Sequence, residues 1–211
     1  MDYIFITGAS GLLGSEIVRQ LSEMNFRIIG QYYKNKPALL KNTTWLYGDF
    51  SNLSSLKNFL NTNKKELIKS SYLINCYGPI TYKNIKNLKT EDYQNDYFSN
   101  VIVPIEIINF LLNQEKQYLK SSVNIGFELA GTFKPVKNVL PYLMAKNALL
   151  EYTLSLEEVY MNIKFNMVSP ITLEGAKVPS RNGTSISVQI IAKAVIKVLL
   201  GKKSGENRIY K

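Results

Sequence analysis

Residues 4–14 read Ile-Phe-Ile-Thr-Gly-Ala-Ser-Gly-Leu-Leu-Gly, and the fold prediction starts from this stretch. Its apolar beginning predicts a buried strand, and three glycines follow at a spacing of three: Gly8, Gly11 and Gly14. An apolar pattern of helical period then begins at Leu13. A strand, a glycine turn and a helix in this order aim the free N–H groups of a helix N-terminus at whatever lies beside them. This order predicts a site for the pyrophosphate of a dinucleotide. The alternative is an ordinary strand-to-helix turn, because a glycine motif alone is weak evidence.

Segments typical of strands and of helices alternate along the rest of the chain. Strands are expected at 3–7, 26–31, 44–48, 71–75, 121–125, 164–168 and 207–210. Helices are expected at 12–24, 52–61, 91–113, 140–160 and 187–200, with a short helical turn near 37–41. This alternation predicts a single doubly wound Rossmann-type α/β domain over residues 1–211, with about seven parallel strands and helices on both faces.

Length and composition limit the class of protein. A chain of 211 residues suits one domain. Its single cysteine, Cys76, permits no internal disulfide, which fits a reducing compartment. The first strand is expected directly after the N-terminal residues, which leaves no room for a signal peptide. The longest mainly apolar stretch, 101–112, is too short to span a bilayer. We therefore expect a cytoplasmic protein without a membrane partner.

The net charge of +10 and the absence of histidine limit the chemistry. Such a charge can indicate nucleic acid or an anionic membrane surface. The lysines, however, are spread over the whole chain and form no long basic run with interleaved aromatics, so we expect solvated surface charge and no nucleic-acid partner. Without histidine, Ser-His-Asp hydrolysis and most zinc catalysis are excluded. We expect no metal site, and acid–base steps must use Tyr, Lys, Asp or Glu.

Tyr142 and Lys146 form a second constellation at the start of a strongly helical pattern. A spacing of four residues puts both side chains on one helix face. An ammonium group close to a phenol stabilises the phenolate and is expected to lower the pKa of Tyr142 from about 10 toward neutral pH. Such a phenol can exchange a proton with a carbonyl or an alcohol. Taken alone, this pattern is a common accident in a chain with 14 tyrosines.

The glycine turn and the Tyr-Lys pair, in this order and on these elements, resemble the short-chain dehydrogenase/reductase family. The resemblance covers nearly the whole chain, and the glycine spacing is that of the family's extended and atypical branches. Five segments carry it: Thr-Gly-Ala-Ser-Gly-Leu-Leu-Gly at 7–14, Gly-Asp-Phe at 48–50, Asn-Cys-Tyr-Gly at 75–78, Tyr-Leu-Met-Ala-Lys-Asn-Ala-Leu at 142–149 and Val-Ser-Pro-Ile at 168–171.

The resemblance implies a role for each of these segments. The implied cofactor contacts are Gly8, Ser10, Gly11, Leu12, Leu13 and Gly14 at the phosphates, Asp49 and Phe50 at the adenine, and Asn75, Tyr77, Gly78, Pro170 and Ile171 elsewhere on the dinucleotide. Tyr142 is implied as the general acid or base, and Lys146 as its support and as a ligand of the nicotinamide ribose. The implied activity is interconversion of a carbonyl and an alcohol by hydride transfer.

Asn100 is the third implied catalytic residue. Pro104 has no N–H to donate to the carbonyl of Asn100, four residues earlier, and is expected to kink the helix. The family keeps an Asn in this helix, and its main-chain carbonyl holds a water linked to the active-site Lys. The alternative is a surface Asn before a kink.

The chain departs from the family at the catalytic serine, which is expected after the fifth strand. Gly126 and Phe127 stand there, and neither has a hydroxyl group. Loss of one such donor typically costs about 3 kcal/mol of transition-state stabilisation. Three interpretations stay open. Thr132 or the 75–78 loop replaces the donor, the enzyme is slow or unusual, or the chain is a dinucleotide-binding sensor or partner protein with weak or no turnover.

The type of cofactor is predicted from the residues that follow the second strand. An NAD site usually has an acidic side chain there, which binds the ribose hydroxyls. Residues 24–48 contain no Asp or Glu but include Lys34 and Lys36. Lys34, together with Ser10 in the glycine turn, suits the 2′-phosphate of NADP, so we predict NADP and regard NAD as the alternative. Lys34 as a plain surface lysine is the other interpretation.

Substrate and assembly are less constrained. Few residues follow Pro170, whereas the extended branch carries a large C-terminal lobe for nucleotide sugars. The expected substrate loop, 172–187, is short and contains glycines typical of a mobile lid. A small or exposed carbonyl substrate is therefore expected. The family often pairs the helices that correspond to 91–113 and 140–160 across a dimer, so the resemblance implies a homodimer. The alternative is that their apolar residues serve the core.

Overall fold

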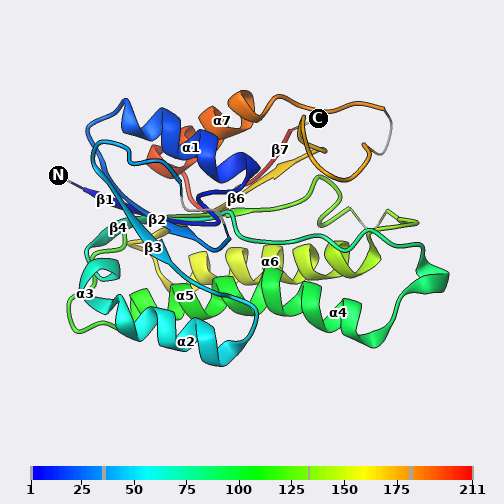
Figure 1. Cartoon of the computed structure of the whole chain (residues 1–211), viewed down its shortest axis with the longest axis horizontal. Helices are drawn as coiled ribbons and strands as arrows, with labels where there is room; N and C mark the ends of the chain where they lie inside the picture. Colours follow the sequence, from blue (N-terminus) through cyan, green and yellow to red (C-terminus); the bar gives the residue numbers. More distant parts are fainter. Residues whose placement is uncertain (1, 35–36, 133, 181–182, 211) are drawn as a thin grey trace.

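A seven-stranded parallel sheet forms the middle layer of the computed structural model (Figure 1), which describes residues 2–34, 37–132, 134–180 and 183–210. The strands are β1 (Tyr3–Thr7), β2 (Arg27–Tyr32), β3 (Thr43–Tyr47), β4 (Ser70–Asn75), β5 (Ser121–Ile125), β6 (Lys164–Pro170) and β7 (Asn207–Tyr210). Their order across the sheet is β3-β2-β1-β4-β5-β6-β7, and every neighbouring pair is parallel. The predicted doubly wound α/β fold is confirmed.

Helices cover both faces of the sheet. They are α1 (Leu12–Ser22), α2 (Leu53–Thr62), α3 (Lys64–Leu67), a 3-10 turn η1 (Ile85–Asn87), α4 (Thr90–Tyr97), a π-helical turn η2 (Phe98–Ile102), α5 (Val103–Leu112), α6 (Leu140–Val159) and α7 (Val188–Leu200). In Figure 1, α1 and α7 lie on one side of the sheet, and α2, α4, α5 and α6 lie on the other. Within the described ranges, no helix combines the length and the hydropathy that a bilayer crossing requires.

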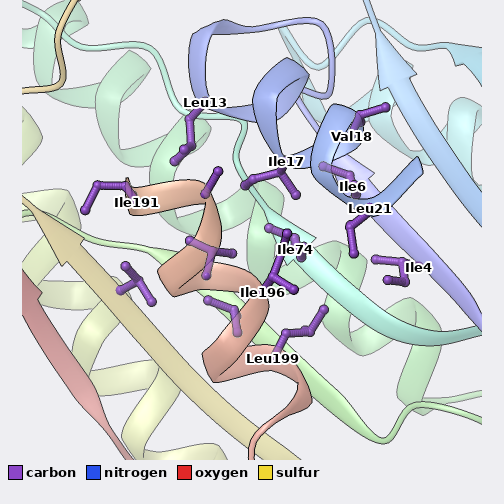
Figure 2. Packing of buried hydrophobic residues seen from close by; sticks show 14 of the residues in the cluster. Ile4, Ile6, Leu13, Ile17, Val18, Leu21, Ile74, Ile191, Ile196 and Leu199 are labelled. Carbon is purple, nitrogen blue, oxygen red and sulfur yellow. The ribbon is translucent and has the colours of Figure 1, made fainter. Parts of the chain in front are cut away.

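The central strand β1 shows why these segments become buried strands. Successive side chains of a strand point to opposite faces. Ile4 and Ile6 pack with Ile17 of α1 and Ile191 of α7 on one face, as Figure 2 shows, whereas Phe5 enters the core on the other face. Because helices cover both faces, the strand is a continuous apolar run rather than an alternating one.

Three phenylalanine rings meet in the core beneath α2 and α5. Phe59 of α2 lies between two phenylalanines, with its ring centroid 6.3 Å from that of Phe5 and 5.1 Å from that of Phe50. Phe50 follows β3, and its ring is fully buried. The segment after β3 is thereby anchored in the core, close to the carboxyl ends of the strands.

The helical turn predicted near 37–41 is wrong. Residues 37–40 form no regular structure, and a turn at 41–42 leads directly into β3. The N–H of Thr43 donates to the Leu40 carbonyl (3.2 Å), and Asn42 takes a φ of 61°. The indole N–H of Trp45 donates to the carbonyl of Ala38 (3.1 Å). Both bonds are donated by residues of β3, so the carbonyls of Ala38 and Leu40 are not available for a helical turn.

The predicted helix 91–113 forms but is not uniform. It consists of α4, η2 and α5, and the wide π turn lies immediately before Pro104. A π turn commonly marks the place where a regular bonding ladder is interrupted, often at a functional site, and proline interrupts it here by lacking an N–H. The short elements α3 and η1 were not predicted, because each contains one turn or less of periodic pattern.

A single buried glutamine joins the ends of three strands. Gln31 is the penultimate residue of β2. Its Oε1 accepts from the N–H of Gly8 (2.8 Å), and its Nε2 donates to the carbonyl of Gly48 (2.7 Å). Its own carbonyl accepts from the N–H of Ala9 (2.9 Å). The turn after β1 and the chain leaving β3 are therefore tied to the end of β2.

We expect Gln31→Leu to lower the free energy of unfolding by about 2–4 kcal/mol, because it leaves two backbone groups without partners at nearly constant side-chain volume. Urea unfolding measures this change. The control is Gln117→Leu at an exposed position, for which a change within about 0.5 kcal/mol is expected. Equal effects of the two substitutions would contradict this role for Gln31.

Candidate functional site

The glycine turn between β1 and α1 is shaped to receive an anion. Helix α1 begins after Gly11, and no side chain in the described chain caps it. The N–H groups of its first turn have no partners within the helix. A Cβ atom on Gly14 would overlap the Gly8 carbonyl oxygen and lie 2.8 Å from Ala9 Cα. The turn therefore requires glycine at 14, and its free donors fit the diphosphate of a dinucleotide.

The loop after β4 lies directly against this turn. Thr7 Oγ1 accepts from the N–H of Tyr77 (3.1 Å). A Cβ atom on Gly8, whose φ is 60°, would lie 2.9 Å from the backbone nitrogen of Tyr77. The Tyr77 hydroxyl donates to the carbonyl of Phe50 (3.3 Å). The structure thus brings together the predicted segments 7–14, 48–50 and 75–78.

An aromatic cluster that the sequence analysis missed lies beside the predicted adenosine region. Tyr33 and Tyr47, both exposed, have ring centroids 6.1 Å apart. Lys34 is exposed, and its Nζ lies 5.9 Å from the centroid of the Tyr33 ring. The available signal was the Tyr-Tyr-Lys run that follows the buried part of β2. Lys36 lies outside the described residues.

Asp49 and Phe50 occupy the end of β3 in different ways. The Asp49 carboxylate accepts from the N–H of Ser51 (2.9 Å) at a half-buried position. The Phe50 ring points into the core, so only its backbone remains for contact with an adenine. Asp49 is therefore the better placed of the two for a side-chain contact.

The loop after β4 ends beside two buried side chains of the predicted site. Its Gly78 lies next to Asn100 and Lys146. Lys146 is 3% exposed, and its Nζ donates to the carbonyl of Ile125 at the end of β5 (2.7 Å). A Cβ atom on Gly78 would overlap Asn100 Oδ1 and lie 3.4 Å from Lys146 Nζ. Asn100 is fully buried, and its Oδ1 has no hydrogen-bond partner among the described residues. The predicted residues Asn100 and Lys146 therefore both pack closely against Gly78.

Tyr142 lies one turn before Lys146 on α6, with Lys146 Nζ 5.2 Å from its ring centroid. Burial lowers the pKa of Lys146 to about 7, whereas Cys76 and then Asp96 act in the opposite direction. Burial, and then Asp96, raise the pKa of the Tyr142 phenol. The expected lowering of the Tyr142 pKa is therefore wrong for this arrangement, because the ammonium group bonds to the Ile125 carbonyl and lies over the ring.

Phe127 stands where the family's serine was expected, and its ring packs against Tyr142 with centroids 5.6 Å apart. A Cβ atom on Gly126 would overlap Ser169 Oγ and lie 2.6 Å from Met167 Sδ, so a serine does not fit at 126. Thr132 Oγ1 donates to the Leu129 carbonyl within its own loop (2.8 Å). The hydroxyl of Thr132, the replacement considered from the sequence, is thus engaged in a turn.

A cleft of about 370 Å³ opens beside Phe127. Its lining consists of Ile80, Tyr82, Phe127, Pro135, Val136, Lys137, Asn138, Val139, Thr172, Val178, Pro179 and Ser180. The lining is mainly apolar and, in the described part of the chain, carries one charged side chain, that of Lys137. Part of the expected substrate loop, 172–180, forms one wall, while residues 181–182 of that loop lie outside the described residues.

The remaining predicted cofactor residues lie at the ends of β4 and β6. Asn75 Nδ2 donates to Asn124 Oδ1 (2.8 Å), and Asn75 Oδ1 has no partner among the described residues. Pro170 is buried at the end of β6, and the N–H of Ile171 donates to the carbonyl of Tyr210 (2.9 Å). The cofactor role of Pro170 and Ile171 stays a prediction.

A second hollow, of about 360 Å³, lies between α4, η2 and α6 on the outer helical layer. Its lining is Tyr93, Gln94, Tyr97, Phe98, Ile102, Pro141 and Met144. Tyr97 and Met144 are exposed. These are the helices through which a homodimer was expected, and that dimer stays a prediction.

The sequence and the fold both resemble known proteins. The model of the family described as "NAD dependent epimerase/dehydratase family" matches residues 4–210. A short chain dehydrogenase family protein from Francisella tularensis has the same fold, with a TM-score of 0.84 and 21% identity over 99% of this chain and 96% of that one. A short chain dehydrogenase from Leptospira borgpetersenii, solved with bound NAD+, has a TM-score of 0.83 and 16% identity over 100% of this chain and 91% of that one.

One further similarity is local. A segment of 35 residues is 49% identical to the probable low-salt glycan biosynthesis reductase Agl14 of Haloferax volcanii. This segment is 17% of the chain and 12% of that protein. So short a match carries no conclusion about substrate.

We expect Gly14→Ala to lower the free energy of unfolding by about 1–3 kcal/mol, because its methyl group overlaps the backbone of the turn. Urea unfolding measures the loss. The matched control is Ser15→Ala, one residue further along α1 at an exposed position, where little change is expected. Unchanged stability of Gly14→Ala would show that the turn relaxes and does not need glycine.

Proposed function

The chain belongs to the NAD dependent epimerase/dehydratase family, and from this premise we propose that it is an NADP-dependent oxidoreductase that interconverts a carbonyl and an alcohol. One observation carries the proposal: Tyr142 and Lys146 lie together on α6, and Lys146 borders the same loop that contacts the glycine turn. A phenol and an ammonium group next to a dinucleotide site form a proton-transfer centre.

The residues present fit a dinucleotide. The free N–H groups at the start of α1 would hold the diphosphate, with Gly8, Ser10, Gly11, Leu12, Leu13 and Gly14 around it. When bound, the cofactor supplies or accepts a hydride. The buried region around Gly78, where Asn100 Oδ1 lacks a described partner, is where Lys146 and Asn100 would orient its reactive end.

Tyr142 would serve as the general acid in the reducing direction. Its raised pKa keeps the phenol protonated at neutral pH, so the hydroxyl can donate its proton to the carbonyl oxygen. In the oxidising direction the phenolate would take that proton back. Lys146, one turn further along α6 and held by the Ile125 carbonyl, would bind the nicotinamide ribose of the cofactor.

The substrate would occupy the cleft beside Phe127. Its mainly apolar lining favours a carbonyl compound with an apolar body, and its volume suits a small molecule. The Phe127 ring contributes an aromatic surface where the family places a hydroxyl. Activity is therefore expected with small ketones or aldehydes rather than with a sugar nucleotide.

A second candidate function follows from the lack of a hydroxyl group at positions 126 and 127. Without the hydroxyl donor at 126 or 127, the chain would bind the dinucleotide as a sensor or partner protein with little turnover. This candidate requires no role for the Tyr142 hydroxyl. The two candidates therefore differ in whether removal of the Tyr142 hydroxyl changes turnover.

We expect Tyr142→Phe to abolish nearly all turnover in a screen of small ketones and aldehydes with NADPH, while the affinity for NADPH stays within about twofold of wild type. Steady-state absorbance and isothermal titration give the two quantities. Tyr152→Phe, at a half-buried position of the same helix where the hydroxyl donates to Asn109 Oδ1, is the control and should retain activity. Turnover by Tyr142→Phe equal to that of wild type would rule out the proposed acid–base role.

The preference for NADP is proposed from the end of β2. Gln31 is occupied by backbone groups and no carboxylate follows, whereas Lys34 is exposed and paired with no described acid. A lysine at this position can bind the 2′-phosphate through a charge-assisted hydrogen bond.

Lys34→Ala should weaken NADPH binding about 10- to 100-fold, the equivalent of one charge-assisted hydrogen bond, and leave NADH binding unchanged. Isothermal titration of both cofactors provides the comparison. Lys41→Ala, further along the same connection, is the matched control. If Lys34→Ala weakened the binding of NADH as much as that of NADPH, Lys34 would not be binding the 2′-phosphate.

A further inference from the structure

The cleft beside Phe127 carries charge of one sign only. Among the described residues that line it, Lys137 is the one charged residue, and neither Asp nor Glu is present. Lys137 is exposed and forms no ion pair with an acid in the described part of the chain. A positive charge at the wall of a mainly apolar cleft is complementary to a ligand that combines an apolar body with a negative group.

Hydrogen bonds hold the segment that carries Lys137 against the loop that precedes α4. The N–H of Lys83 donates to the carbonyl of Asn138 (2.8 Å), and the N–H of Ile85 donates to the carbonyl of Lys137 (3.2 Å). A side-chain bond joins the same two segments, because Asn138 Nδ2 donates to the hydroxyl oxygen of Tyr82 (3.0 Å). The backbone of Lys137 is therefore anchored at the cleft, and its side chain is left to bind a ligand.

The Tyr82 hydroxyl adds a neutral donor close to this segment. Its oxygen accepts from Asn138, and its proton has no acceptor among the described residues. Tyr82 lines the cleft, so this proton can be donated to a ligand there. Lys137 and Tyr82 lie on segments that are bonded to each other, so a charged and a neutral donor serve the same side of the cleft.

The field of α6 acts in the same direction. Val139, the N-cap residue of this helix of 20 residues, lines the cleft, and no side chain in the described chain caps it. The positive end of the helix dipole favours a negative group near its first turn. The helix end thus strengthens the preference for an anion that Lys137 creates.

The apolar body of the ligand would pack near the proposed acid. Phe127 lines the cleft, and its ring packs against the ring of Tyr142 with centroids 5.6 Å apart. Val178 and Pro179 line the cleft as well. Because Phe127 and Lys137 line one cleft of about 370 Å³, a small molecule can contact both. Its carbonyl would lie beside Phe127 and its negative group at Lys137.

We propose that Lys137 is the specificity-determining residue of the cleft and that the substrate is a small apolar oxo acid, or the corresponding hydroxy acid, whose carboxylate binds Lys137. A carboxylate carries one charge and suits one lysine with one neutral donor. The carbonyl rests on the proposed function, whereas the binding of the carboxylate does not. In the reducing direction the carbonyl carbon takes a hydride from NADPH, which becomes NADP+, and the carbonyl oxygen takes a proton from Tyr142. The carboxylate is unchanged by the reaction.

The test is isothermal titration of the full chain, with and without saturating NADPH, with two unreactive probes of nearly the same shape. These are hydrocinnamate and its neutral amide, hydrocinnamamide. We expect wild type to bind the acid about 10-fold more tightly than the amide, the effect of one charge-assisted hydrogen bond. Lys137→Met should abolish most of this preference and keep the affinity for the amide within about twofold. Lys134→Met, at an exposed position earlier in the same loop and outside the cleft lining, is the matched control and should bind both probes as wild type does.

Three results would overturn the proposal: equal affinity of wild type for the two probes, a preference for the acid that survives in Lys137→Met, or binding of neither probe. If Lys137→Met does not fold, Lys137→Gln serves as the second variant and must lose the same preference. The probes cannot be reduced, so these results do not depend on turnover. Failure of the proposed function shows itself separately, in the cofactor titration and in Tyr142→Phe.

In an active enzyme, kinetics test the same residue. Phenylpyruvate should have a higher kcat/KM than phenylacetone, in which a methyl group replaces the carboxylate. Lys137→Met should raise the KM for phenylpyruvate about 10-fold and leave kcat within about twofold, because the contact is made equally in the ground state and the transition state. A fall in kcat at unchanged KM would contradict a role in substrate binding.

Discussion

The amide side chain of Gln31 is the contact on which the cofactor-facing edge of the sheet depends. Through Gly8, Ala9 and Gly48 it connects the turn after β1, the end of β2 and the exit of β3. Each of these groups is a backbone donor or acceptor that would otherwise be buried without a partner. The bond to Gly8 also fixes the turn that precedes α1. An acidic residue at this position could not donate to the Gly48 carbonyl, so the amide suits this junction and leaves the recognition of the ribose to residues further along.

The glycine turn at this junction is connected to the reactive side chains through two close contacts. Gly8 touches the backbone of Tyr77, and the next residue, Gly78, borders Asn100 and Lys146. The absence of side chains at these two glycines lets three segments that are distant in sequence approach closely. The helix before Pro104 is tied to this loop at two points, through Asp96 and through Asn100. A site with a desolvated ammonium group requires neighbours that do not move, because each lost contact leaves a charge unpaired.

Much of the fold could be predicted from the sequence, because its signals are local. Strands buried on both faces appear as apolar runs, and the glycine spacing marks the turn. The errors lie where distant groups decide the outcome. The 37–41 segment is shaped by β3 and the Trp45 indole. The pKa of Tyr142 is raised by burial and by the negative charge of Asp96. Asp96 and Gln31 carried no signal at all, since a single polar residue in a helix or strand resembles a surface residue until the fold buries it.

A titration of the purified chain with NADPH and NADH, followed by Trp45 fluorescence, tests directly whether the glycine turn holds a dinucleotide with a preference for NADP. Trp45 is the sole tryptophan, and its ring packs on Gly30 of β2 next to Ala9 of the turn. We predict saturable quenching by both cofactors, with NADPH binding at least about 10-fold more tightly, the equivalent of about 1.4 kcal/mol. If neither cofactor bound, the oxidoreductase and the sensor would both be ruled out, and a tighter NADH complex would contradict the role assigned to Lys34.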